Sequence, residues 1–153
     1  MVRPVYLLDT NILSEPTKSR PNPSVLERLE QVSPLCAMSS ITYHELYYGV
    51  HLVQNETRRL HLERYLLNVV KPSFPVLSYD SSAAEIHAVM RARLREKGMS
   101  VADMDAQIAA IAIANNLILV TRNLRDFEPM ATVSTLMLEN WFVLEEENAS
   151  VGD

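Results

Sequence analysis

The chain has 153 residues, of which 48% are hydrophobic, and its formal net charge is −5. This length allows one core of ordinary size and excludes two independent ones, so we expect a single domain over residues 1–144. A polar tail, 145–153, should be disordered. The acidic balance argues against a protein that coats nucleic acid through bulk electrostatics, although it does not exclude a nuclease.

Cysteine content and the N-terminal segment bear on the cellular compartment. The single cysteine, Cys36, can form neither an internal disulfide nor a cysteine-rich zinc site. Its apolar surroundings, Pro-Leu-Cys-Ala-Met, favour an inert core thiol. The N-terminal apolar run is short and is interrupted by Asp9, so it is neither a signal peptide nor a membrane span. We therefore expect a soluble cytoplasmic protein with no membrane partner.

Short β-like runs alternate with longer helical patterns along the chain. The first predicted strand is 5–8, and the segment after it becomes helical until Pro16 stops the helix. A polar loop, 18–23, precedes a helix over 24–32 with apolar residues at helical spacing. Pro34 ends that helix ahead of the second strand.

The second predicted strand, 35–38, leads into a helix that contains Glu45 and that Ser39 or Ser40 caps. An amphipathic helix follows over 56–70. The remaining predicted elements are a strand at 76–79, a helix capped by Asp80, Ser81 or Ser82 that runs to about Glu96 and stops at Gly98, a helix at 103–116, a strand at 117–121 and a short strand at 133–136. Such alternation predicts a mostly parallel sheet that helices cover on both faces.

Three acidic residues, Asp9, Glu45 and Asp105, stand in separate segments, each beside an apolar element. Isolated carboxylates next to core-forming runs are costly to bury unless a cation offsets the desolvation. Ligands of open parallel sheets bind at the carboxyl ends of the strands, where Asp9, Thr121 and Asn123 are expected. The pattern therefore predicts a site for a hard divalent cation, Mg²⁺ or Mn²⁺, and a metal-dependent phosphodiesterase.

Two neighbours of these acids carry further expectations. Asp103 precedes Asp105 by two residues, which is about 200° around a helix, so both cannot face one metal ion. We assign Asp105 as the ligand and Asp103 as an N-cap or supporting group. One helical turn after Glu45, Gly49 removes a side chain, which suggests close packing near that carboxylate.

Other catalytic sites fit the residues less well. His44 and Glu45 begin like a zinc-protease motif, but Tyr48 stands where the second histidine should be. Asp9 at a strand end is also typical of phosphatases with an aspartyl nucleophile, yet the second aspartate is replaced by Asn11. A phosphatase stays open as a minor alternative. With only 3 glycines, the chain has no glycine-rich phosphate loop.

Basic residues gather in three places, at 58–64, 91–97 and 122–125. Some of these side chains could contact phosphates. A solvated helix face is the favoured interpretation of any one cluster, because alternate residues of a helix point to different sides.

Four motifs follow one another in order: Leu-Leu-Asp9-Thr-Asn-Ile-Leu-Ser, Ser39-Ser-Ile-Thr-Tyr-His-Glu45-Leu-Tyr-Tyr-Gly, Ala102-Asp-Met-Asp105-Ala-Gln-Ile-Ala-Ala-Ile-Ala and Leu119-Val-Thr-Arg-Asn123-Leu-Arg-Asp-Phe. Together with the closing Leu138-Glu-Asn-Trp141, they resemble the PIN-domain ribonucleases of the VapC toxin type. The resemblance runs from about Val5 to Trp141. Four ordered motifs over that span are specific, whereas any one alone would be weak.

The resemblance implies a three-layer α/β/α sandwich with a mostly parallel central sheet and an acidic pocket that binds magnesium or manganese. It implies endonucleolytic cleavage of RNA, in which a metal-activated water attacks a backbone phosphate. By position, Asp9, Glu45 and Asp105 match the catalytic, metal-binding acids of the family.

The resemblance also assigns supporting residues. Asn11 and Thr121 match positions that support the pocket by hydrogen bonding. Asn123 falls where some family members have a fourth acid and many toxins have asparagine, which leaves a second metal site open.

Partners are implied in the same way. The family forms homodimers, and a VapB-type antitoxin inserts a segment into the active-site groove, so contact with DNA would be indirect, through the antitoxin. A DNA-directed nuclease of the same fold, or a non-catalytic RNA- or protein-binding module, remains an alternative.

Overall fold

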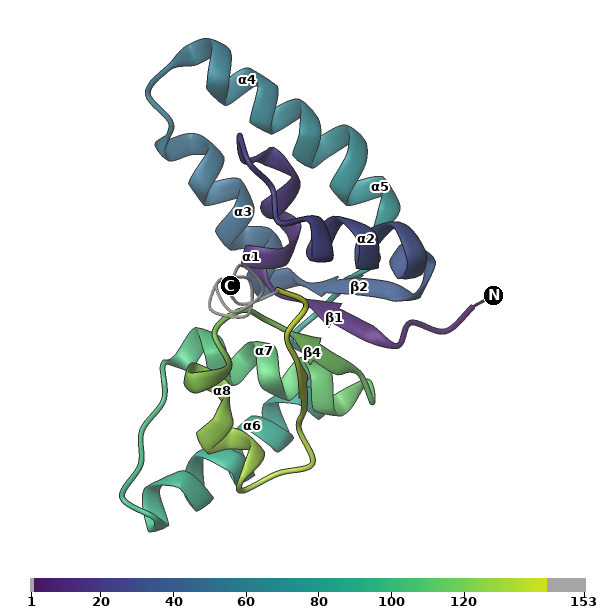
Figure 1. The fold of residues 1–153 in the computed structure, drawn as a ribbon. Helices are drawn as coiled ribbons and strands as arrows, with labels where there is room; N and C mark the ends of the chain where they lie inside the picture. The colour runs from purple at the N-terminus through teal and green to yellow at the C-terminus, as the bar shows by residue number, and fades with distance from the viewer. Residues whose placement is uncertain (1, 143–153) are drawn as a thin grey trace, which may run out of the picture.

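Five parallel strands form the centre of the molecule. The computed structural model describes residues 2–142, and its sheet has the order β3-β2-β1-β4-β5 with every neighbouring pair parallel (Figure 1). The strands are β1 (Tyr6–Leu8), β2 (Cys36–Ser39), β3 (Val76–Leu77), β4 (Ile118–Val120) and β5 (Met137–Glu139). The predicted parallel sheet is confirmed.

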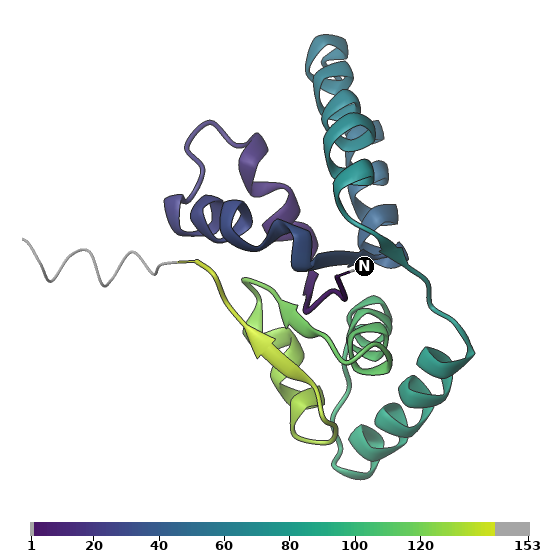
Figure 2. The same cartoon turned by 90° about the vertical axis from the view of Figure 1, so that its right-hand side faces the viewer.

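Helices cover both faces of this sheet. They are α1 (Thr10–Leu13), α2 (Pro23–Val32), α3 (Ser40–Leu52), α4 (Glu56–Tyr65), α5 (Lys71–Ser73), α6 (Ser81–Glu96), α7 (Asp103–Ala114) and α8 (Leu124–Ala131). Leu7 and Leu119 belong to the core shared with α6, α7 and α8. The next residues along the strands, Leu8 and Val120, belong to the core shared with α1 to α4. Figures 1 and 2 show these two helical layers, and the α/β/α sandwich is confirmed.

Helices α3 and α4 form a pair that projects from the sheet (Figures 1 and 2). A π-helical turn, η3 (Leu66–Val70), continues α4 into α5, so the helix predicted over 56–70 is confirmed and extends to Ser73. Large apolar side chains on this pair and its extension, Leu52, Leu60 and Val69, are exposed. The pair therefore presents apolar surface beyond what the sheet covers.

Polar side chains begin two helices as predicted. Ser39 Oγ accepts a hydrogen bond from the Thr42 N–H at 2.9 Å at the start of α3. Asp80 Oδ1 accepts one from the Ala83 N–H at 2.9 Å at the start of α6. Gly98 follows α6 with a φ of 69°, a left-handed conformation that favours glycine. These local signals set the ends of the helices that flank the site.

The C-terminal third differs from the prediction. The sequence analysis predicts no element over 124–131, where the structure has the helix α8 with Pro129 inside it. The strand predicted at 133–136 was wrong: that stretch connects α8 to β5, and its Val133 and Leu136 are buried in the core. A connector with buried apolar residues has the same short pattern as a strand.

Cys36 is the inert core thiol that the sequence predicts. Its side chain is buried in β2, and burial raises the pKa of the thiol to about 12. No helix within residues 2–142 has the length and apolar character needed to cross a membrane. The predicted boundary at 144 and the tail 145–153 lie outside the described residues.

Candidate active site

Asp9 follows β1 and caps helix α1. Its Oδ1 accepts a hydrogen bond from the Thr10 N–H at 2.8 Å, and its Oδ2 accepts one from Thr121 Oγ1 at 2.8 Å. A longer contact of 3.4 Å joins Oδ2 to Asn11 Nδ2. Burial raises the pKa of Asp9, and these three hydrogen bonds oppose the rise because they stabilise the ionised form. Asp9 is thus a buried carboxylate held in one orientation.

Glu45 reaches the same end of the sheet from α3. Its Oε2 accepts a hydrogen bond from Thr10 Oγ1 at 2.8 Å. Thr10 therefore connects two acids, since its N–H binds Asp9 and its hydroxyl binds Glu45. The cap at Ser39 sets where α3 begins and so places Glu45 in the second turn of that helix.

Asp105 approaches from the first turn of α7. Burial is the largest of the causes that raise the pKa of this half-buried carboxyl to about 6, and the negative charges of Asp9, Asp126 and Glu45 add to it. The three acids predicted from the sequence therefore share one electrostatic environment, although they come from separate elements.

Asp126 is a fourth acid, which the sequence reasoning missed. It lies in the first turn of α8, and its charge contributes to the raised pKa of both Asp9 and Asp105. The sequence does contain a signal for the start of a helix. Asn123 is a residue type that often caps helices, and the acidic Asp126 follows it by three positions. Because no helix is predicted after Asn123, this signal alone did not identify Asp126.

Asn11 and Thr121 surround Asp9 with hydrogen bonds. Besides its bond to Asp9, the fully buried Thr121 Oγ1 accepts the Asn123 N–H at 3.1 Å. Asn11 Oδ1 accepts the Arg122 N–H at 3.0 Å. The Asn123 side chain is exposed and makes no capping hydrogen bond on α8. The loop after β4 is thereby tied to Asp9 through Asn11 and Thr121.

Asp103 does not cap α7. The extended residue before the helix is Ala102, which provides no side-chain hydrogen bond, and Asp103 is the first helical residue. The N-cap assignment was therefore wrong by one position. Asp103 lines a hollow with Arg91 and Arg95, and Asp105 is not among the residues that line it. The two aspartates face different surroundings, as two residues of helical spacing require.

An apolar hollow of about 210 Å³ opens beside Thr10 and Glu45, bounded by α1, α3 and α4. Gly49 lines this hollow, and a Cβ added there would meet no atom of the described residues within 4 Å. The close packing expected at Gly49 was wrong. The missing side chain leaves the hollow open one helical turn from Glu45.

The donor set suits a hard divalent cation. Asp9, Glu45, Asp105 and Asp126 offer only oxygen atoms, and the ion pairs formed within residues 2–142 involve none of them. Within the same span, no three His, Cys, Asp or Glu side chains are grouped closely enough to complete a metal site. Carboxylate oxygens are the protein ligands that a hard cation such as Mg²⁺ takes, and the chemistry of these four side chains fits such an ion.

Comparison with known proteins places this geometry in a family. The family model described as PIN domain matches residues 6–132. The chain belongs to the PIN-domain family. It is 38% identical over 131 residues to the plasmid stability protein StbB of Pseudomonas syringae. The match covers 81% of this chain and 91% of StbB. It is 35% identical over 137 residues to ribonuclease VapC2 of Haemophilus influenzae, covering 89% of this chain and 97% of VapC2.

Solved structures of PIN-domain relatives have the same fold. FitAcB from Neisseria gonorrhoeae superposes with a TM-score of 0.81 at 31% identity and covers 89% of this chain and 97% of that one. VapBC2 from Rickettsia felis, bound to a DNA fragment from its promoter, superposes with a TM-score of 0.74 at 29% identity. The match covers 90% of this chain and 98% of that one. VapBC-5 from Mycobacterium tuberculosis, of the VapBC family of toxin-antitoxin systems, superposes with a TM-score of 0.66 at 26% identity. The match covers 92% of this chain and 100% of that one.

Proposed function

We propose that this chain is a metal-dependent endoribonuclease and the toxin of a type II toxin–antitoxin pair, with residues 1–144 as one nuclease domain. The convergence of Asp9, Glu45 and Asp105 from three elements, with the pKa of Asp105 raised to about 6, carries the proposal. Membership of the PIN-domain family and similarity to ribonuclease VapC2 support it. The substrate class is single-stranded or locally unpaired RNA.

Asp9, Glu45 and Asp105 would hold Mg²⁺ or Mn²⁺, and Asp126 adds negative potential beside them. When bound, such an ion activates a water molecule and neutralises the phosphoryl oxygens of the scissile phosphate. The raised pKa of Asp105 indicates negative charge that a cation would compensate.

The chain's own residues position this chemistry. Thr121 and Asn11 fix the carboxylate of Asp9, and the hydroxyl of Thr10 fixes that of Glu45. The N-terminal end of α7, which carries Asp105, adds positive potential that favours a phosphate at the same place. In this mechanism the threonines and Asn11 are positioning residues, and the three acids are catalytic.

RNA cleavage and cation binding test the proposal together. Thermal unfolding of the wild type should shift upward on addition of Mg²⁺ or Mn²⁺ because the ion binds only the folded acidic group. Single-stranded RNA should then be cleaved in the presence of either ion and not in EDTA. Cleavage of single-stranded DNA in preference to RNA would favour the DNA-directed alternative. A cation-dependent shift without cleavage of either would favour a binding module.

The proposed protein partner is a VapB-type antitoxin, through which contact with DNA would be indirect. We expect it to place an arginine among Asp9, Glu45 and Asp105, because a guanidinium can engage two carboxylates at once. The apolar hollow beside Glu45 could anchor the same segment. Co-expression with the neighbouring antitoxin gene should give a complex without nuclease activity, and replacing that arginine by alanine should restore some cleavage. Equal inhibition with no basic group near the acids would refute this contact.

We also propose a homodimer. The exposed Leu52, Leu60 and Val69 give the α3 and α4 region apolar surface that a second copy could cover. Size-exclusion chromatography with light scattering should give about twice 17.3 kDa. A strict monomer at micromolar concentration would contradict this interface.

A further inference from the structure

A hollow of about 260 Å³ lies between the second half of α6, the connector after it and the first turn of α7. Asp103 lines it, whereas Asp105, about 200° further around the same helix, belongs to the acidic group. The N-terminal turn of α7 therefore separates this hollow from the site of the proposed chemistry.

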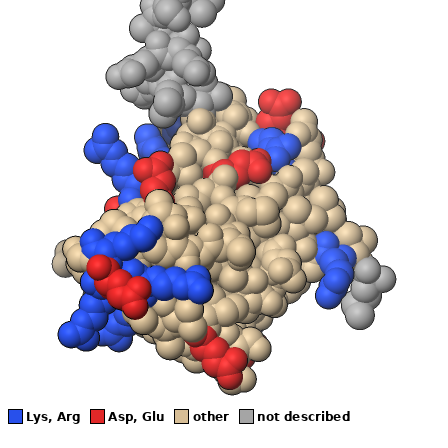
Figure 3. All heavy atoms as spheres, turned by 90° about the horizontal axis from the view of Figure 1, so that it is seen from below, with Lys and Arg blue, Asp and Glu red and all other residues tan. Residues whose placement is uncertain are grey.

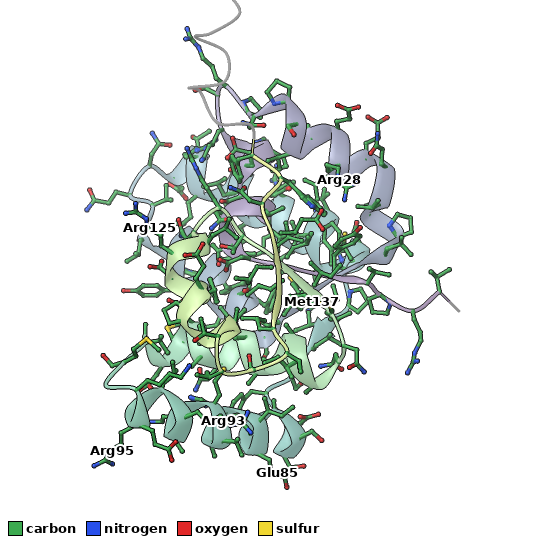
Figure 4. All side chains as sticks on the ribbon, turned by 60° about the horizontal axis from the view of Figure 1, so that its bottom comes forward. Arg28, Glu85, Arg93, Arg95, Arg125 and Met137 are labelled. Carbon is green, nitrogen blue, oxygen red and sulfur yellow. The ribbon has the colours of Figure 1, made fainter. Side chains whose placement is uncertain are left out.

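Two arginines, one turn apart on α6, line the hollow. Arg91 and Arg95 are exposed, and neither forms an ion pair or a side-chain hydrogen bond with another residue in the described span, 2–142. Arg93 lies on a different side of the helix, where its Nη1 donates to the Val133 carbonyl at 3.0 Å. Figure 4 shows Arg93 directed toward the body of the molecule and Arg95 at the outer end of α6, and Figure 3 shows the basic side chains gathered there. The cluster at 91–97 thus has two sides, and Arg91 and Arg95 are on the side that lines this hollow.

His87 also lines this hollow and carries a buried polar atom. It is 8% exposed, and its Nδ1 lies 2.9 Å from the Tyr79 hydroxyl, while Nε2 is buried without a hydrogen-bond partner in the described chain. If the Tyr79 hydroxyl donates to Nδ1, the ring hydrogen is on Nε2, which is then a donor. A buried ring nitrogen without a partner is unfavourable, and here it belongs to a residue that lines the hollow.

The electrostatic balance of the hollow is positive. The start of α7 has no side-chain cap, so its first N–H groups are available to an acceptor. Asp103 contributes one negative charge against the two arginines. An anion with several acceptor oxygens, such as a phosphate, could accept from both guanidinium groups and lie at the start of α7.

We propose that this hollow binds a backbone phosphate of the same RNA strand whose scissile phosphate lies at Asp9, Glu45 and Asp105. The proposal rests on the proposed ribonuclease function. It gives a protein of net charge −5 a local anchor for a polyanion, on the far side of the α7 turn from the acids. Arg91 and Arg95 position the strand and do not take part in the chemistry.

The double variant Arg91→Ala, Arg95→Ala tests the anchor. Lys97→Ala is the matched control because Lys97 is the C-cap residue of the same helix and lines a different hollow. On an RNA long enough to span both sites, the double variant should raise KM about tenfold or more and leave kcat unchanged. It should also reduce the slope of log affinity against log salt by roughly 0.7 for the lost phosphate contact. The Lys97→Ala protein should behave as wild type. An unchanged KM and salt slope in the double variant would overturn the proposal.

A second measurement separates this proposal from the ribonuclease function. Inorganic phosphate is titrated into the wild type and the double variant while the imidazole resonances of His87 are followed by NMR. A saturable shift in the wild type that the double variant loses supports the anion site, even if the wild type cleaves no RNA. No saturable shift in the wild type, together with no cleavage, would refute both the site and the function. Because both arginines are exposed, equal melting temperatures should show that the double variant is folded.

Discussion

Asp9 and Asp105 belong to one acidic group, but they are held in different ways. Asp9, at the end of β1, has hydrogen-bond donors on both carboxylate oxygens, and these oppose the effect of its burial on the pKa. At Asp105, on α7, burial and the neighbouring acids all raise the pKa, and no hydrogen bond from the described residues opposes them. Hydrogen bonds thus hold and stabilise the carboxylate of Asp9, whereas no group in the described chain compensates the negative charge of Asp105.

The largest expected effect is the loss of activity when any of the three acids is neutralised. Asp9→Asn, Glu45→Gln and Asp105→Asn should each reduce metal-dependent RNA cleavage to the level of the EDTA-treated wild type. Each fold should be intact or more stable, because one fewer carboxylate relieves repulsion in the acidic group. Initial rates and melting temperatures check both halves of this expectation. A fully active Glu45→Gln enzyme would mean that the metal site is assigned wrongly.

A smaller effect should follow from removing one of the hydrogen bonds that hold the carboxylate of Asp9. Thr121→Val removes the hydroxyl that donates to Asp9 at 2.8 Å and keeps the buried volume. We expect about 10–100-fold lower activity or metal affinity, as for other groups that orient metal ligands. Thr121→Ser, which keeps the hydroxyl, is the control and should retain most activity. Equal losses in the two variants would point to packing, not to the hydrogen bond.

Substitutions of two other aspartates, Asp126 on α8 and Asp103 on α7, should have milder effects and can be compared directly. Asp126→Asn should lower activity by about tenfold or less and should lower the pKa of Asp105, because it removes a nearby negative charge. Asp103→Asn should retain most activity, since Asp103 faces the other hollow. The pKa of Asp105 in each variant is measured from its carboxyl carbon by NMR. If Asp103→Asn is inactive and Asp105→Asn is active, the ligand has been placed on the wrong residue.

The smallest effect is on stability as a function of pH. The pKa of Asp105 is raised in the folded state from its ordinary value of 3.8 to about 6, so the folded state holds its proton at higher pH than the unfolded chain does. Without metal, this group should therefore make the protein less stable as pH rises from about 3.8 to about 6. Melting curves across that window should show the decline in wild type and a weaker decline in Asp105→Asn. Identical slopes in the two proteins would contradict the raised pKa.

The parts of the site that the sequence predicts are those set by short-range patterns. Asp9 follows an apolar run, Ser39 is a cap residue one turn and a half before Glu45, and Asp105 opens an alanine-rich helix. Strand-and-helix alternation then brings the three acids to one edge of the sheet. Asn11 and Thr121 both donate hydrogen bonds to Asp9, and the supporting role that the family resemblance implies for them stays a prediction.

The parts that the sequence does not predict depend on how elements pack. Asp126 enters the group through α8, a helix that the sequence analysis does not predict. Asn123 occupies the position where, by the resemblance, some family members have a fourth acid. Gly49 suggests close packing in the sequence, but α3 and α4 leave a hollow there. Whether a missing side chain permits contact or leaves space is decided by the spacing of two helices, which residue type alone does not determine.

The central claim is that Asp9, Glu45 and Asp105 together bind a divalent cation. The most direct measurement is an NMR pH titration of the Asp105 carboxyl carbon in the presence and absence of saturating Mg²⁺. We predict a midpoint at about 6 without the ion and a midpoint at least one unit lower with it, because the cation stabilises the ionised carboxylate. The same midpoint under both conditions would contradict a metal site at these residues.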